Sequence, residues 1–117
     1  MTTQSNIVHI LQSAREIIAA PAHWTKDAIA LNTVGEEVPA DHPKAVSWCV
    51  VGVIMKATHD VDEQYRARRV LRDALKYVLN CKFCSLTVYN DATSTVHADI
   101  LRLFDAAIVR AEKGDTP

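Results

Sequence analysis

The stretch Ser47–Ala57, SWCVVGVIMKA, decides how the rest of the chain is interpreted. Its apolar run, taken at its longest as Ala45–Met55, is about half of what a bilayer crossing requires. The run also contains Ser47 and is bounded by Lys44 and Lys56. Its length therefore argues against a membrane segment and leaves a core element as the interpretation.

The residues before this stretch carry the signals of a helix start. Asp41 is a suitable cap, and Pro43 stands near the first helical position, where its missing N–H costs nothing. The β-branched run at 50–54 is typical of a strand, but the start signals and the length favour a helix. We therefore expect a buried helix over Val46–Ala57 at the centre of the core, enclosed by the first, third and last helices, with Gly52 allowing a neighbour to approach closely.

Three further segments place apolar residues at the i, i+3, i+4, i+7 spacing of an amphipathic helix. The first begins at a Ser5 cap and stops before Pro21. The next opens at Asp60 or Asp62, and the last begins near Thr95.

Two segments lack the helical period. The residues AIALNTVGEEVPA, 28–40, predict a small hairpin around Gly35. Leu86–Tyr89 predicts a short extended piece before a turn at Asn90 and Asp91. The fold class expected for 1–117 is mainly α: a single compact domain of about four helices with a small β-hairpin or a short two- to three-stranded element.

Composition and net charge argue against some classes of function. The 117 residues are 49% hydrophobic and 23% charged, with a net charge of −1, which argues against a dedicated nucleic-acid binder. Three cysteines make no disulfide framework, and the first 20 residues have no basic region of a signal peptide, so we expect a cytoplasmic protein.

Several short motifs resemble a family of small bacterial and phage proteins classed as a domain of unknown function. The motifs are HW, which ends at Trp24, the glycine Gly35 ahead of Val38, and the segments HPKAVSWCVVG and YNDATST. The resemblance covers about 24–108 and implies one domain, but no activity. The residues that correspond directly are Trp48, Cys49, Gly52, Asn90, Asp91 and Thr95. Val53 and Tyr89 depart from the usual Ala and Trp, and ATS replaces a Pro-Gly turn.

Cys49 is the candidate nucleophile of a catalytic interpretation. His97, with Asn90 or Asp91, follows it in the chain, as in cysteine-dependent hydrolases. Against this, Cys49 lies several residues into the expected helix among apolar neighbours, and no Gly-rich oxyanion loop is visible. A free cysteine in such surroundings is usually a small buried hydrophobe.

Cys81 and Cys84 form one C-x-x-C pair, which is half of a tetrahedral zinc site. No second pair and no spaced histidine pair accompanies it, so we expect structural thiols, no metal and no cofactor.

Arginines at 66, 68, 69 and 72 give the third helix a basic surface. Asp62 and Asp73 stand at i,i+4 spacing from Arg66 and Arg69, which favours a solvated face with ion pairs. The alternative is a docking surface for an anionic ligand or an acidic protein, either on this face with Tyr65 or at the loop near Trp24 and Tyr89, where aromatic side chains would anchor a partner. Its candidate binding residues are Trp24, Tyr65, Arg66, Arg69, Arg72 and Tyr89.

Two classes of function therefore compete. We expect a small soluble, non-catalytic binding or protein-interaction module, because the sequence shows no assembled nucleophile, base and oxyanion donor. The alternative is the cysteine-dependent hydrolase.

Overall fold

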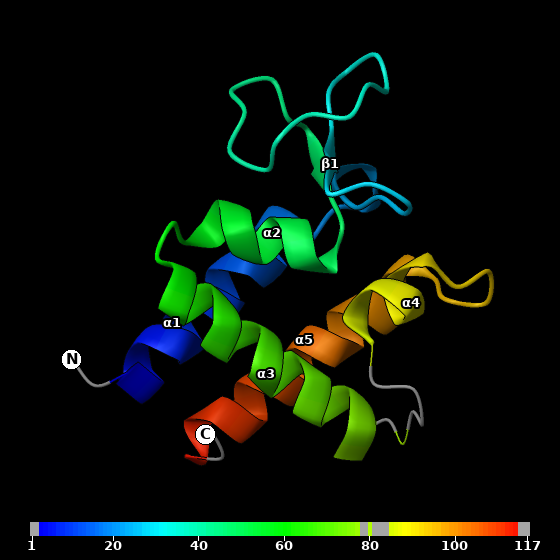
Figure 1. Ribbon diagram of the computed structural model, residues 1–117. Coiled ribbons are helices and arrows are strands. Elements are labelled where there is room, and N and C mark those ends of the chain that lie inside the picture. The colour runs from blue at the N-terminus through cyan, green and yellow to red at the C-terminus, as the bar shows by residue number, and fades with distance from the viewer. Residues whose placement is uncertain (1–2, 78–79, 81–84, 115–117) are drawn as a thin grey trace.

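A computed structural model describes residues 3–77, 80 and 85–114 of the chain. These residues form five α-helices, one short 3₁₀ turn and a two-stranded antiparallel sheet, in a compact body with a radius of gyration of 13.2 Å (Figure 1). The elements in chain order are α1 Thr3–Ile17, η1 Pro21–His23, β1 Ala30–Leu31, β2 Ser47–Trp48, α2 Val50–Ala57, α3 Val61–Tyr77, α4 Leu86–Asp91 and α5 His97–Glu112. The predicted fold class, with four longer helices and a small β element, is confirmed.

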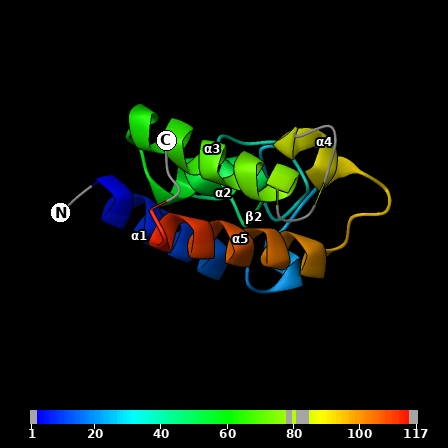
Figure 2. The same ribbon diagram turned by 90° about the horizontal axis from the view of Figure 1, so that it is seen from below.

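The helices pack in two layers. Seen from below, α1 and α5 run antiparallel in one layer, and α2 and α3 lie in the other (Figure 2). The apolar stripes of α1, α3 and α5 meet between the layers, where Leu11, Leu71 and Phe104 are fully buried. Those three stripes follow the predicted helical spacing. Within the described part of the chain, no helix has both the length and the hydropathy to cross a bilayer.

The predicted helix over Val46–Ala57 begins later than expected. Ser47 and Trp48 belong to β2, and α2 starts at Val50 with Cys49 as its N-cap. The Asp41 cap is therefore wrong. β2 pairs with β1, with Ala30 opposite Trp48, so long-range backbone hydrogen bonds override the local start signal.

The neighbours of α2 also differ from the expectation. α2 packs on α1, α3 and α4, whereas α5 packs mainly on α1 and α3. Gly52 has the predicted close neighbour, because a Cβ built there would lie 2.0 Å from the Ile29 carbonyl oxygen.

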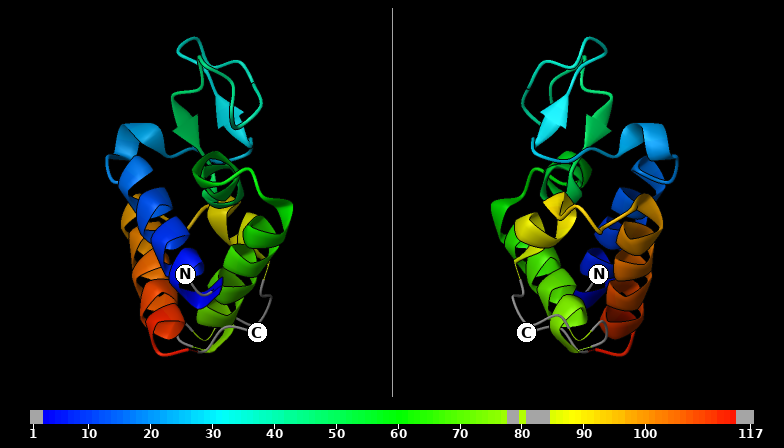
Figure 3. Two further views of the ribbon diagram at one scale, coloured as in Figure 1. Left: turned by 90° about the vertical axis from the view of Figure 1, so that its left-hand side faces the viewer. Right: turned by 90° about the vertical axis from the view of Figure 1, so that its right-hand side faces the viewer.

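The predicted hairpin around Gly35 is present only as a tight turn with one bridge. Gly35 has φ +82, the Asn32 side chain accepts hydrogen bonds from the backbone of Val34 and Glu36, and Leu31 bridges Glu37. The principal partner of β1 is β2. Together with their loop, these strands project from one end of the helical body (Figure 3).

The starts of α4, α1 and α3 agree only in part with the predicted ones. Leu86–Tyr89 lies in α4, so the extended piece is wrong; the Ser85 hydroxyl caps this helix by accepting from the Val88 N–H. α1 begins at Thr3, two residues before the expected Ser5 cap. Asp60 does cap α3 by accepting from the Glu63 N–H.

Candidate functional site

The basic face of α3 carries fewer ion pairs than predicted. Arg66 Nε donates to Asp62 at 2.9 Å, so that pair is confirmed. The predicted Arg69–Asp73 pair is wrong. In the described part of the chain, no carboxylate oxygen lies within 4.0 Å of the guanidinium nitrogens of Arg68, Arg69 or Arg72. Three adjacent cations are thus left without a compensating charge there.

Two of these arginines face a hollow between α3 and α4, which we call the basic groove. It encloses about 410 Å³ and is lined by Val51, Tyr65, Arg68, Arg72, Ser85, Leu86 and Thr87. Tyr65, Arg68 and Arg72 are spaced i, i+3, i+7, which places them in one row along α3. The hydroxyls of Ser85 and Thr87 stand on the opposite wall. The groove therefore combines guanidinium and hydroxyl donors, the groups that bind carboxylate or phosphate oxygens.

The predicted binding residues separate into three groups. Tyr65 and Arg72 line the basic groove, and Tyr65 is 48% exposed. Arg69 is exposed on the same helix but does not line the groove, and Arg66 turns to Asp62. Trp24 and Tyr89 lie elsewhere.

Trp24 and Tyr89 are partly buried and pack against the hydrophobic core. The indole N–H of Trp24 donates to Asn90 Oδ1 at 2.8 Å, and the Lys26 ammonium lies 5.6 Å from the indole centroid. These contacts give Trp24 a role inside the fold, where it ties the segment before β1 to α4.

The binding residues predicted from the sequence do not include Arg68, Ser85 or Thr87. The i, i+3, i+7 row of Tyr65, Arg68 and Arg72 was a usable signal for Arg68. Ser85 and Thr87 were missed because Leu86–Tyr89 was predicted to be extended. The Ser85 cap was the signal that a helix begins there.

Cys49 lies at the N-cap of α2, not several residues inside a helix as predicted. Its Sγ accepts a hydrogen bond from the Gly52 N–H at 3.2 Å. The residue is 5% exposed, and this burial raises the pKa of the Cys49 thiol, against the effect of the Gly52 and Val51 N–H groups. The negative charge of Asp91 raises that pKa further. The surroundings thus favour the neutral thiol over the reactive thiolate.

Of the hydrolase residues, Cys49 and Asp91 line the same hollow, whereas His97 does not. Cys49 borders a hollow of about 400 Å³ with Asp27, Glu37 and Asp91, and no histidine is among the described residues that line it. His97 instead donates from Nε2 to the Ile18 carbonyl at 2.7 Å.

Asn90 is fully buried, and its hydrogen bonds join separate parts of the fold. Its Oδ1 accepts from Trp24 and, at 3.0 Å, from the backbone N–H of Val50. Its Nδ2 donates to the Thr25 carbonyl and to Asp91. An amide in this position organises the backbone around the start of α2.

The C-x-x-C pair, Cys81 and Cys84, lies outside the described residues. Among those described, no three His, Cys, Asp or Glu side chains are grouped so as to hold a metal ion.

Fold and groove together define a small, mainly α domain with a candidate anion-binding surface. The chain belongs to a family of unknown function, DUF6197, whose model matches residues 2–110. This match confirms the resemblance seen in the motifs and extends it toward the N-terminus. No curated protein matches the chain, and no solved structure does.

Proposed function

We propose that this protein is a non-catalytic binding module that docks an acidic segment of a partner protein on the α3 face, with the basic groove as its centre. The observation that carries the proposal is the set of three arginines, Arg68, Arg69 and Arg72, without a carboxylate neighbour in the described part of the chain. Arg69 and Arg72 are exposed and Arg68 is partly exposed, so cations without an ion-pair partner among the described residues are open to a partner protein, whereas Arg66 is engaged with Asp62.

The groove adds shape to this charge. Tyr65 offers a rigid aromatic surface beside two guanidinium groups, and Tyr and Arg are the residues most enriched at the energetic centres of protein interfaces. Leu86 and Val51 supply an apolar floor that a partner side chain would cover. A carboxylate entering the groove would receive charge-assisted hydrogen bonds there.

The charge of the whole chain favours a protein partner over a nucleic acid. A net charge of −1 gives no long-range attraction for a polyanion, whereas a local basic patch suffices for an acidic peptide. The odd number of cysteines supports a cytoplasmic setting, in a bacterium or a phage-infected cell as the family resemblance implies.

A pull-down from the native host tests the proposal. The bait is the wild type, the groove variant Arg68→Glu/Arg72→Glu, or the control Lys44→Glu/Lys113→Glu, which changes the net charge equally at two exposed sites. Circular dichroism and urea unfolding first establish that all three baits fold alike.

The proposal predicts a protein with an acidic segment that the wild type and the control retain and the groove variant loses by at least about tenfold. A separate Arg69→Glu bait shows how far the interface extends beyond the groove. Equal retention by all baits would refute the proposal, and so would retention that nuclease treatment abolishes, because the partner would then be a nucleic acid.

A further inference from the structure

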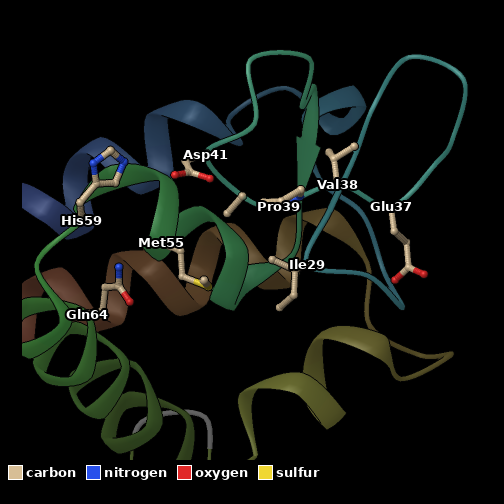
Figure 4. A pocket seen from close by; sticks show the side chains of 9 residues that line it. Ile29, Glu37, Val38, Pro39, Asp41, Met55, His59 and Gln64 are labelled. Atoms are coloured by element: carbon tan, nitrogen blue, oxygen red, sulfur yellow. The ribbon is translucent and has the colours of Figure 1, made fainter.

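A third hollow, on the side of α2 that carries Met55, has a different chemistry. We call it the Met55 pocket. It encloses about 540 Å³, which lies within the range of small-molecule sites of roughly 300–1,000 Å³. Met55 comes from α2, Pro39 and Asp41 come from the loop between β1 and β2, and His59 and Gln64 come from the α2–α3 connection and from α3 (Figure 4).

The body of the Met55 pocket is apolar. Met55 is partly buried, and Ile29, Val38 and Pro39 complete the apolar lining. Ile29 is 41% exposed, so its side chain has apolar surface that the described fold does not cover. A methionine thioether adapts its shape to different apolar ligands, which suits a binding surface.

The polar groups around this apolar body are acceptors. Asp41 and Glu37 are carboxylates, and neither makes an ion pair with another described residue. Gln64 uses its Nε2 to donate to the Thr58 carbonyl at 2.9 Å, which leaves its carbonyl oxygen as the free end of the amide. The described residues that line the pocket include His59 but no lysine or arginine.

We propose that the Met55 pocket binds a small organic cation, an amine with an apolar body. The ammonium group is held by Asp41, and the apolar body lies on Met55, Ile29 and Pro39. Charge complementarity selects this class, because the two carboxylates would repel an anion, and an ammonium group gains an ion pair with Asp41 that a neutral ligand cannot make. The inference is independent of the basic groove, which has the opposite charge.

The test uses 2-phenylethylamine, 2-phenylethanol and phenylacetate, three probes of similar shape that are cationic, neutral and anionic. The chain has two methionines, so [¹³C-methyl]methionine labelling gives a two-signal spectrum, and Met55→Leu identifies the Met55 signal. The titrations are run at pH 8, where the amine is protonated. For probes of this size, affinities on the order of millimolar are expected.

The expected result is a saturable shift of the Met55 methyl signal with the amine, at an affinity at least about fivefold higher than for the alcohol. Asp41→Asn should remove that advantage without changing the affinity for the alcohol. The control Asp73→Asn, on α3 and outside the pocket, should leave it intact. The inference is overturned if the amine causes no shift, if the alcohol or phenylacetate binds as well as the amine, or if Asp41→Asn binds the amine like the wild type.

Discussion

The side-chain oxygen of Asn90 lies 3.0 Å from the backbone nitrogen of Val50, 40 residues earlier in the chain, and accepts its hydrogen. The same oxygen accepts the indole N–H of Trp24. One buried amide thus joins α4, the first turn of α2 and the segment before β1. It also satisfies a backbone donor that the start of every helix leaves open.

Replacing Asn90 by Ala should destabilise the protein by about 2–4 kcal/mol, because the buried N–H of Val50 and the partly buried indole N–H of Trp24 lose their acceptor. The matched control is Asn32→Ala. The Asn32 amide also accepts from two backbone N–H groups, but in an exposed turn where water replaces it, so its loss should cost about 1 kcal/mol or less. Urea unfolding at 25 °C measures both. Equal costs for the two variants would mean that Asn90 is not a structural centre.

Gly52→Ala should be more damaging than its small size suggests. The new Cβ would lie 2.0 Å from the Ile29 carbonyl oxygen, the atom that accepts the Cys49 N–H, so backbone must move at the β1–α2 junction. We expect a loss of about 3 kcal/mol or more. Gly35→Ala is the comparison: its Cβ meets nothing within 4 Å, and only the φ of +82 costs about 1–2 kcal/mol. In thermal melts, the Tm of Gly52→Ala should therefore be well below that of Gly35→Ala. The reverse order would contradict the close contact between Gly52 and Ile29.

The raised pKa of the Cys49 thiol predicts how stability changes with pH. Because the fold favours the neutral thiol, the unfolded chain loses this proton first as pH rises. The stability that the fold gains from the neutral Cys49 thiol is fully present below the ordinary thiol pKa. It is lost as pH rises from there through the higher pKa of the folded protein. Its slope is at most about 1.4 kcal/mol per pH unit, the limit for one proton.

Urea unfolding of wild type and Cys49→Ser between pH 7 and pH 10 measures this effect. Serine keeps a capping acceptor but does not titrate in this range, and the other two cysteines are common to both proteins. Wild type should lose more stability than the variant as pH rises. Parallel curves would show that Cys49 ionises as freely in the fold as in the unfolded chain, and would renew interest in it as a nucleophile.

The parts of the fold that follow a local apolar period could be predicted from the sequence. The buried stripes of α1, α3 and α5 are examples, and so is the Asp60 cap. The β2 strand could not be predicted in this way. Ser47 and Trp48 are held by hydrogen bonds to β1, earlier in the chain, whereas the nearby Asp41 and Pro43 are local signals of a helix start.

The candidate site divides in the same way. Tyr65 and Arg72 stand out from the spacing along one helix. Their apposition to Ser85 and Thr87 depends on how α4 docks beside α3, which no local pattern encodes. The i,i+4 spacing of Arg69 and Asp73 permits an ion pair, as predicted. That pair does not form because of the side-chain conformations, which the spacing does not determine.

The most direct test of the central claim, that the α3 face binds acidic protein segments, is an amide NMR titration with a synthetic peptide rich in Asp and Glu. A Lys-rich peptide of equal length serves as the control ligand. Shifts should concentrate on Tyr65–Arg72 and on the start of α4, and Arg68→Gln/Arg72→Gln should weaken binding by at least about tenfold. Lys44→Gln/Lys113→Gln, with the same change of charge, should bind like wild type. Shifts on another face, or equal binding by both double variants, would contradict the account.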